Sequence, residues 1–351
     1  MSQVISLADI RRLAADFAQS GIVAAPLPTE SGKVFYQTVA ADEVQDIVLD
    51  GSLKCVNSII EFLVPRHEVL YTFVRKGNDV ELTDAPVFDT PQLILGCRPC
   101  ESASLPILDP VFAWDFNDRF FQSRRAMTTV VSIACQKADS DCFCTDVGGS
   151  PENTSGADAI LYPLDGDRFE VRLLTEKGKV LFAGKTTESS DVGRACEGPK
   201  ATLDTAKITR WLNSHFNDPL WAELAHQCVG CGACTSVCPT CHCFDIVDEG
   251  SYQKGRRVKN WDYCQSALFT LHASGHNPRP DQGARQRQRI THKFAIYPEK
   301  FGAILCTGCG NCSRLCSAAL GIKPALEKIS SEAAEDLMPV PPLWVRNTQD
   351  K

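Results

Sequence analysis

Two runs of four cysteines with the same spacing, C-x2-C-x2-C-x3-C, constrain this chain more than any other feature. The first run holds Cys228, Cys231, Cys234 and Cys238, and the second holds Cys306, Cys309, Cys312 and Cys316. This spacing is typical of proteins that bind 4Fe-4S clusters, so two runs predict two clusters. The glycines within each run suit tight loops whose N–H groups can point at cluster sulfurs. We therefore expect the chain to transfer electrons one at a time.

The fourth thiolate of each cluster is expected to come from the other run. In two-cluster ferredoxins the last cysteine of each run ligates the other cluster. We predict one cluster at Cys228, Cys231, Cys234 and Cys316, and a second at Cys306, Cys309, Cys312 and Cys238. A pair of zinc sites or a disulfide framework is the alternative, but zinc sites usually use paired C-x2-C knuckles.

The composition suits a cytoplasmic protein with two domains. The chain has 351 residues, of which 44% are hydrophobic, enough for two cores. Its 18 cysteines are unusually many, and residues 1–17 lack the apolar region and cleavage site of a secretory signal. No apolar stretch reaches the roughly 20 residues that cross a bilayer. Abundant cysteine without a secretion signal indicates metal in a reducing compartment, with no membrane insertion.

Positive charge is concentrated between the two cysteine runs. Residues 254–300 contain ten Lys or Arg against three acids, although the whole chain has a net charge of -7. Nucleic-acid binding, a solvated face, docking of a partner and compensation of cluster charge are the alternatives, and we expect no nucleic acid because the chain as a whole is acidic. Reduced clusters are anions, so nearby guanidinium groups would raise their reduction potential. The candidates for this role are Arg256, Arg257, Arg285, Arg287 and Arg289.

The pattern of apolar residues predicts an α/β N-terminal domain followed by a mainly helical domain that carries a two-cluster ferredoxin-like module. The expected divisions are 1–202, 203–337 with a helical, Arg-rich insertion, and a C-terminal tail at 338–351. Strands are expected at 33–40, 69–76, 91–97, 128–135, 168–175 and 178–184, with 91–97 and 128–135 in the centre of a sheet. Helices are expected over 1–17, twice within 205–228, and over 261–274.

A third group of cysteines precedes the two runs. Five of them fall at 97–144, mostly where expected strands give way to loops. Alternation in an extended Cys142-Phe143-Cys144 segment would put both sulfurs on one side. We predict a third 4Fe-4S cluster at Cys100, Cys135, Cys142 and Cys144, with Cys97 in reserve. Buried free cysteines in a core are the alternative.

Several motifs together resemble one known family. They are GCRPCESASL, CFCTDVGGSPENTSGAD, CPTCHCFDIVD, RRVKNWDYC, RQRQRITHKF and CTGCGNC. From about Gly96 to the end of the second run, the chain is similar to the beta subunits of sulfhydrogenases, the soluble group 3 NiFe hydrogenases, and to the A subunit of anaerobic sulfite reductase. The resemblance implies that the GCRPCE and CFC segments are functional and that Cys100 matters more than Cys97. Ser317 departs from the proline that usually follows the last cysteine, as Pro239 does in the first run.

Six cysteines are left outside the three predicted clusters. Cys241, Cys243 and Cys264 could supply an alternative ligand, tune a cluster from outside its ligand shell, or simply pack. Histidine ligation by His242 is a further possibility. Besides Cys97, the remaining Cys55 and Cys196 stand alone and are expected to be structural.

These observations favour an electron-transfer subunit without a catalytic residue of its own. The chain has no convincing G-x-G-x-x-G fingerprint or P-loop, so we expect it to bind no flavin or nucleotide by itself. Hydride chemistry needs such a cofactor, and the resemblance implies a flavin-containing NAD(P)H oxidoreductase subunit and a catalytic hydrogenase or reductase subunit as partners. The alternatives are a catalytic iron-sulfur reductase of disulfides or sulfur compounds, using one of the extra thiols, and a redox sensor.

Overall fold

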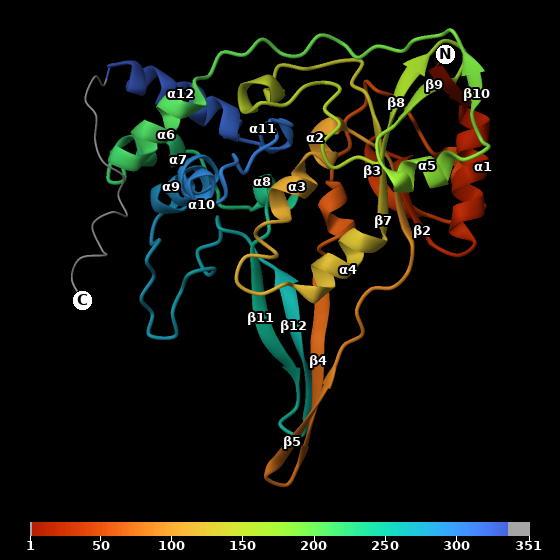
Figure 1. The fold of residues 1–351 in the computed structure, drawn as a ribbon. Helices are drawn as coiled ribbons and strands as arrows, with labels where there is room; N and C mark the ends of the chain where they lie inside the picture. The colour runs from red at the N-terminus through yellow and green to blue at the C-terminus, as the bar shows by residue number, and fades with distance from the viewer. Residues whose placement is uncertain (1, 336–351) are drawn as a thin grey trace.

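A twisted eight-stranded sheet forms the N-terminal half of the computed structural model, which describes residues 2–335 (Figure 1). Its strand order is β10-β1-β9-β8-β7-β6-β2-β3. The four strands β2, β6, β7 and β8 run parallel, and antiparallel strands flank them on both sides. The strands are β1 (Ser2–Ser6), β2 (Ile22–Pro28), β3 (Val34–Val39), β6 (Gln92–Cys97), β7 (Thr128–Ile133), β8 (Ala159–Leu164), β9 (Arg168–Leu173) and β10 (Thr187–Ser189).

The central strands confirm what their sequence predicts. All six residues of β6 are buried, as are five of the six in β7, because helices and loops cover both faces. Leu93 and Leu95 pack on the side of helix α1 (Leu7–Ala18), whereas Ile94 packs on the opposite side. That opposite side is where the C-terminal half of the chain lies, since Tyr297 and Leu305 belong to the same apolar cluster.

Short helices connect the strands. They are η1 (Val44–Asp46), η2 (Ile59–Phe62), α2 (Pro99–Ser102), α3 (Ser104–Leu108), α4 (Arg119–Met127), η3 (Cys144–Val147) and α5 (Glu176–Phe182). Two of these elements carry cysteines of the third group: α2 follows β6 directly, and η3 follows the loop after β7. Both therefore lie near the carboxyl ends of parallel strands, where open α/β sheets commonly place their functional groups.

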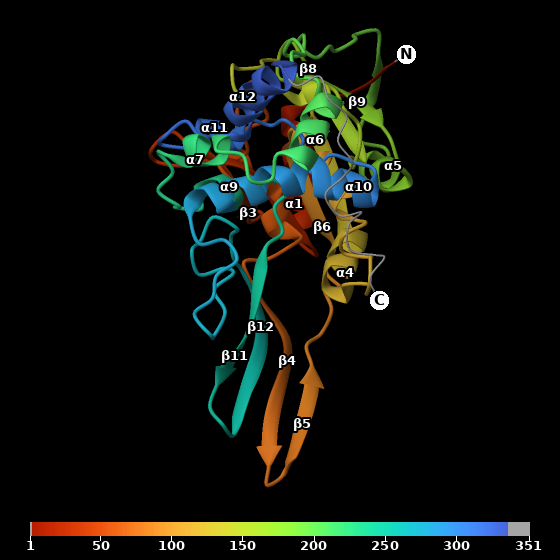
Figure 2. The same ribbon diagram turned by 90° about the vertical axis from the view of Figure 1, so that its left-hand side faces the viewer.

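A second sheet projects away from the body of the molecule, as Figures 1 and 2 show. It is antiparallel, in the order β11-β12-β4-β5. Its strands are β4 (His67–Lys76), β5 (Asp79–Asp84), β11 (Phe244–Gly250) and β12 (Lys254–Trp261). At its base, Lys259 forms a buried ion pair with Glu68 at 2.7 Å and a second ion pair with the partly exposed Asp118 at 3.1 Å. The sheet thus combines strands from the first and the second half of the sequence.

The C-terminal half is not mainly helical as the sequence suggests, because it contributes the two long strands β11 and β12. Its helices are α6 (Thr205–Ser214), α7 (Leu220–Ala225), α8 (Ala233–Ser236), α9 (Gln282–Thr291), the π-helix η4 (His292–Ile296), α10 (Tyr297–Phe301), α11 (Asn311–Arg314) and α12 (Ile322–Glu335). The two helices expected before the first run are confirmed as α6 and α7. The domain boundaries stay predictions, and the tail at 338–351 lies outside the described residues.

Three expected elements are wrong. Residues 178–184 are largely helical, in α5, because Thr175 caps the helix and accepts a hydrogen bond from the N–H of Gly178. Residues 261–274 form no helix; the side chain of Asn277 instead bonds Ala267 and Thr270 and holds a loop. The first helix begins only at Leu7, since residues 2–6 pair with β9 and β10.

Among residues 2–335 no helix is both long and apolar enough to cross a membrane.

Candidate metal centres

The two cysteine runs have the same backbone shape. In each run two glycines adopt positive φ angles, 67° and 76° at Gly230 and Gly232, and 64° and 78° at Gly308 and Gly310. A short helix follows, α8 in the first run and α11 in the second. A β-carbon at Gly232 would lie 2.6 Å from the Tyr263 ring, so a larger residue does not fit. Glycine thus permits both the turn and the close packing.

The second run lies close to the last cysteine of the first. Cys238, Cys306 and Cys312 are buried, with 7 to 9% of each exposed. Burial is the main cause that raises the pKa of Cys306 to about 12, and the thiols of Cys238 and Cys312 add to it. The same two thiols raise the pKa of Cys309, after burial and its other neighbours. The four residues predicted for the second cluster therefore lie in the same part of the structure, within electrostatic range of one another.

The first run is nearer the surface. Cys231 is exposed, whereas burial raises the pKa of Cys234 to about 11, with further contributions from Cys312, Cys264 and Cys228. Cys316 accepts a hydrogen bond from the N–H of Leu320 at 3.3 Å. Its place as the fourth ligand of the first cluster stays a prediction, as do the other ligand assignments.

The third group of cysteines also comes together, from three separate segments. Cys100 lies in α2, Cys135 follows β7, and Cys142 and Cys144 border η3. Burial and the thiols of Cys135 and Cys142 raise the pKa of Cys144 to about 11. Cys135 likewise adds to the raised pKa of Cys100, again after burial. These four side chains share one neighbourhood.

Two single cysteines differ in their relation to the third group. The reserve residue Cys97 is fully buried in β6, where its sulfur lies 3.5 Å from the Ser132 hydroxyl, and burial raises its pKa to about 12. Cys196 lies beside the group, because its N–H donates to the carbonyl of Cys135 at 2.7 Å. Sequence reasoning missed this contact, since 61 residues separate Cys196 from Cys135 and no motif links them.

Unpartnered buried guanidinium groups show that an anion fits beside these cysteines. Arg289 is 2% exposed, and all three of its side-chain nitrogens lack a hydrogen-bond partner. Its neighbours include Cys234, Cys312, Cys241 and Cys264. Arg98 is 4% exposed with two unpartnered nitrogens, and its charge acts to lower the pKa of Cys135. Because burying an unpaired cation is costly, thiolates that hold an anionic cluster match both positions.

The sulfur atoms also receive N–H donors, as ligands of iron-sulfur clusters commonly do. Six of the twelve predicted ligands accept such hydrogen bonds: Cys142, Cys228, Cys238, Cys306, Cys312 and Cys316. The donor to Cys228 is Gln282, at 3.2 Å, and the donor to Cys142 is Lys54, at 3.5 Å. Among residues 2–335 no three of these side chains converge closely enough to hold a metal ion as they stand. The nearby cations and N–H donors are compatible with bound clusters, which would supply one-electron redox chemistry.

The three cysteine groups lie in series. Cys100 of the third group raises the pKa of Cys309, and Cys312 does the same to Cys234, in each case after burial. The backbone supports the first of these junctions: the Phe143 N–H donates to the Gly308 carbonyl at 2.9 Å. A β-carbon at Gly308 would lie 2.5 Å from Cys144. The order in space is therefore third group, second run, first run.

A buried carboxyl group lies at the junction of the third group and the second run. Glu101 is 3% exposed, and its carboxyl accepts hydrogen bonds from the Ser58 hydroxyl at 2.5 Å and the Ile59 N–H at 3.1 Å. Burial raises its pKa to about 8. Sequence reasoning missed Glu101, although it directly follows Cys100 in the GCRPCE motif.

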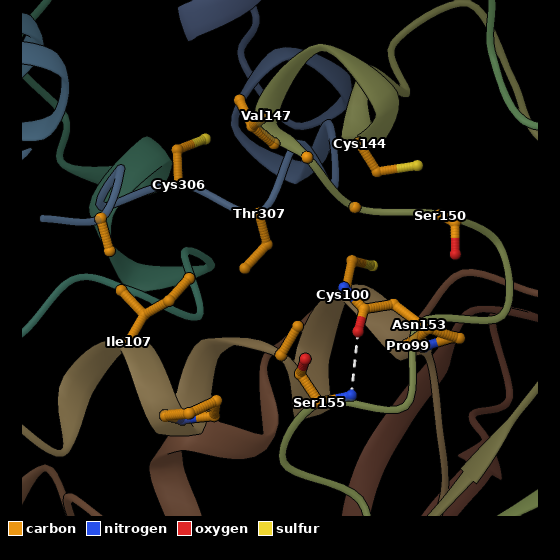
Figure 3. A pocket seen from close by; sticks show the side chains of 15 residues that line it. Pro99, Cys100, Ile107, Cys144, Val147, Ser150, Asn153, Ser155, Cys306 and Thr307 are labelled. Atoms are coloured by element: carbon orange, nitrogen blue, oxygen red, sulfur yellow. Dashed lines mark hydrogen bonds between the residues drawn. The ribbon is translucent and has the colours of Figure 1, made fainter.

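A cavity of about 320 Å³ opens between the third group and the second run (Figure 3). Cys100, Cys144 and Cys306 line it together with apolar side chains such as Ile107 and Val147. None of its lining residues is charged. The cavity therefore gives an uncharged approach to both groups of thiols.

The extra thiols of the CPTCHCF and WDYC motifs form pairs. The free thiol of Cys241 is hydrogen-bonded to that of Cys238, and the free thiol of Cys243 is hydrogen-bonded to that of Cys264. The bond from Cys243 is the main cause that lowers the pKa of Cys264 to about 6. Cys241 and Cys243 also line a separate cavity of about 210 Å³. Their alternative roles as ligands, tuning groups or packing stay open.

His242 lies between two of these cysteines in a largely buried position. Its Nδ1 lies 3.1 Å from the carbonyl oxygen of Thr240. Burial lowers the pKa of His242 to about 4, so the imidazole is neutral at neutral pH. Ligation of iron by this ring stays a prediction.

The five arginines of the basic segment separate into different roles. Arg256 and Arg257 lie on the projecting sheet, where they pair with Glu249 and Asp248. Arg287 donates a hydrogen bond to the Phe216 carbonyl near the surface. Arg285 donates hydrogen bonds to the Gln282 side chain and to backbone carbonyls. Arg289 alone of the five is surrounded by cysteines without a partner of its own.

Comparison with known proteins gives a family match for the two cysteine runs and one similar protein over most of the chain. Residues 227–320 match the family described as "4Fe-4S dicluster domain". The chain is 28% identical, over 308 residues, to sulfhydrogenase 2 subunit beta of Pyrococcus furiosus, which covers 84% of this chain and 89% of that protein. No solved structure matches the chain. The resemblance to sulfhydrogenase beta subunits is confirmed, and the domain match supports iron-sulfur clusters in the C-terminal part.

We expect Cys144→Ser to remove one cluster of three, because it deletes a thiolate of the third group. Iron analysis of the anaerobically purified protein should fall from about twelve to about eight atoms per chain, since each cubane contains four. Low-temperature EPR of the reduced protein should lose one of three signals. Cys97→Ala is the control, and should keep all of the iron. Detection of only two clusters in the unmodified protein would contradict the prediction of a third cluster.

A second prediction concerns Asp139, which holds the third group against the second run. Its carboxylate pairs with Arg314 at 2.8 Å and accepts the N–H groups of Asp141 and Cys142 at 3.1 Å. Burial alone would raise the pKa of Asp139, but hydrogen bonds from Arg314 and Cys142 lower it below its usual value. A carboxyl group whose pKa is lowered on folding contributes stability above its unfolded pKa of about 4 and loses it at lower pH.

Asp139→Asn should therefore destabilise the protein by about 1 kcal/mol at pH 7, a low figure because both partners are partly exposed. The difference from the unmodified chain should shrink as the pH falls from about 5 to 3. Denaturant unfolding followed by circular dichroism measures it, with Asp141→Asn as the neighbouring control. A difference independent of pH would contradict this role.

Proposed function

We propose that this chain is the iron-sulfur subunit of a hydrogenase-type complex and relays single electrons between a flavin-containing NAD(P)H oxidoreductase subunit and a catalytic subunit. The catalytic subunit would be a NiFe hydrogenase or a sulfite reductase. The observation that carries the proposal is the serial placement of three cysteine groups within electrostatic range of one another, from Cys100 through Cys309 and Cys312 to Cys234.

The two ends of the series differ in a way that supports two separate partners. Cys231 in the first run is exposed, so electrons can reach or leave that end at the surface. At the other end, the uncharged cavity beside Cys100 and Cys144 gives access to the third group. In the middle, Cys238, Cys306 and Cys312 are buried, and of these three only Cys306 lines that cavity. This arrangement suits entry at one end and exit at the other.

The identity of the complex rests on the relative from Pyrococcus furiosus. Its name describes a beta subunit of a sulfhydrogenase, and the similarity covers most of both chains. By this analogy the present chain works beside other subunits, and hydride chemistry takes place on a partner that holds a flavin or nicotinamide. We place the complex in the cytoplasm because 18 cysteines suit a reducing compartment.

One observation favours a second candidate, a catalytic reductase of a disulfide or sulfur compound. The cavity of about 210 Å³ exposes Cys241 and Cys243 to small molecules, and Cys243 pairs with a thiol whose pKa is lowered. Turnover of a disulfide or polysulfide by the isolated chain, with dithionite-reduced viologen as electron donor, would establish this candidate and reject the pure relay.

Cys309→Ser tests the relay in the assembled complex. Because Cys309 lies between the third group and the rest of the second run, its loss should reduce NAD(P)H-coupled turnover at least tenfold. Turnover of the catalytic subunit with an artificial dye should change less than twofold, since the dye bypasses this chain. Cys55→Ser is the control for cysteine substitution. Unchanged NAD(P)H-coupled activity in Cys309→Ser would refute the proposed route.

A further inference from the structure

We infer that Lys293, together with Arg289, raises the reduction potential of the cluster predicted at Cys238, Cys306, Cys309 and Cys312, so that an electron is retained in the middle of the series. The inference rests on the proposed relay and goes beyond it, because it identifies the cluster that is reduced most readily. Lys293 is the lysine of the RQRQRITHKF segment, where the sequence assigned it no role of its own, and it acts through the predicted ligand Cys238 as a positioning and tuning residue.

Both cations lie on one face of a continuous helix. Arg289 is in α9 and Lys293 is in the π-helix η4 that continues it, four residues later. Residues at this spacing are neighbours on a helix surface, and like charges there repel. Each residue is only 2% exposed, and neither forms an ion pair with a carboxylate among the described residues. Two buried cations so placed need a nearby anion.

Lys293 has all three of its N–H donors fixed. Its Nζ donates to Cys238 Sγ at 3.5 Å, to Thr240 Oγ1 at 2.9 Å and to the Leu305 carbonyl at 3.1 Å. Because Leu305 precedes Cys306, the ammonium group is bonded to both segments that supply the second cluster. Burial alone would lower the pKa of Lys293, but Cys238, Cys241 and Cys306 raise it above its usual value.

The middle of the series receives positive charge from two buried residues that have no carboxylate partner in the described part of the chain. The predicted second cluster has Lys293 beside Cys238 and Arg289 beside Cys312. At the first run Arg289 faces Cys234, and at the third group Arg98 faces Cys135. Lys54 and Arg314 also lie near Cys142, but both are partly exposed, so that water screens their charge, and Arg314 is paired with Asp139.

Two carboxyl groups near the series are already engaged elsewhere. Glu101 near Cys309 uses one carboxyl oxygen for hydrogen bonds from Ser58 and Ile59, and Asn311 approaches the other at 3.5 Å. Asp139 near Cys142 is paired with Arg314. Neither is bonded to Lys293 or Arg289. The two cations therefore act on the sulfurs without a competing carboxylate partner.

The direction of the effect follows from charge. Reduction adds one electron to an anionic cluster in a poorly solvated site, so a fixed cation stabilises the reduced form and raises the potential. A hydrogen bond to a ligand sulfur acts in the same direction. A flavin partner that delivers two electrons one after another would find one of them held in this chain while the second follows.

Lys293→Met tests the inference by removing the charge while keeping a similar side-chain length. In an EPR-monitored redox titration of the full chain, we expect the signal of one cluster to shift to more negative potential. The ratio of oxidised to reduced cluster at a fixed potential should change at least tenfold, which for one electron corresponds to 59 mV. The other two signals should move less. Lys293→Arg should restore the potential, because it keeps the charge.

Arg287→Gln is the matched control, since it removes a charge from the surface side of the same helix and should leave all three potentials unchanged. If Lys293→Met fails to fold, Lys293→Gln replaces it with the same expectation. Iron content separates the two proposals: fewer than about twelve atoms in the unmodified chain would contradict the relay with three clusters. Full iron content with unshifted potentials in Lys293→Met, or an equal shift in Arg287→Gln, would overturn the tuning role alone.

Discussion

Charge balance in the interior is the constraint on which the rest of this structure depends. Removing an ion from water costs several kcal/mol unless a counter-ion or hydrogen bonds replace the hydration. Arg98, Arg289 and Lys293 are all buried, and none of them forms an ion pair with a carboxylate in the described part of the chain. Their surroundings are rich in cysteine sulfur. Thiolates bound to iron-sulfur clusters would supply the missing negative charge, so folding and cluster binding are coupled through electrostatics.

The α/β sheet gives this arrangement its rigid frame. The parallel strands β6 and β7 end near Cys97 and Cys135, and the loops that follow them carry the third group. The C-terminal half packs on the same face, where Tyr297 and Leu305 share a core with Ile94. Close backbone contact between Gly308 and Cys144 then fixes the distance between the second run and the third group. Rigid spacing of this kind is what a series of one-electron centres requires.

Local sequence patterns predicted much of this arrangement correctly. The buried strands β6 and β7 and the helices α6 and α7 follow from short-range apolar patterns, and the glycine turns follow from the spacing of the cysteine runs. Two of the three failures have a common cause: residues 178–184 and 261–274 differ from expectation because the Thr175 side chain accepts, and the Asn277 side chain donates, a hydrogen bond with the backbone. Side-chain caps and loop contacts of this kind compete with apolar pattern and propensity.

By itself, the sequence determined the type of cofactor and the likeness to a sulfhydrogenase subunit, because the spacing of thiols within a short loop is a local property. Tertiary structure alone decided which groups become neighbours over long separations. It brought Cys196 to Cys135, placed Glu101 and Cys100 beside Cys309, and enclosed Lys293 against Cys238. It also paired β4 with β12, which lie almost two hundred residues apart. Such contacts depend on how whole layers pack, and no short stretch of sequence encodes them.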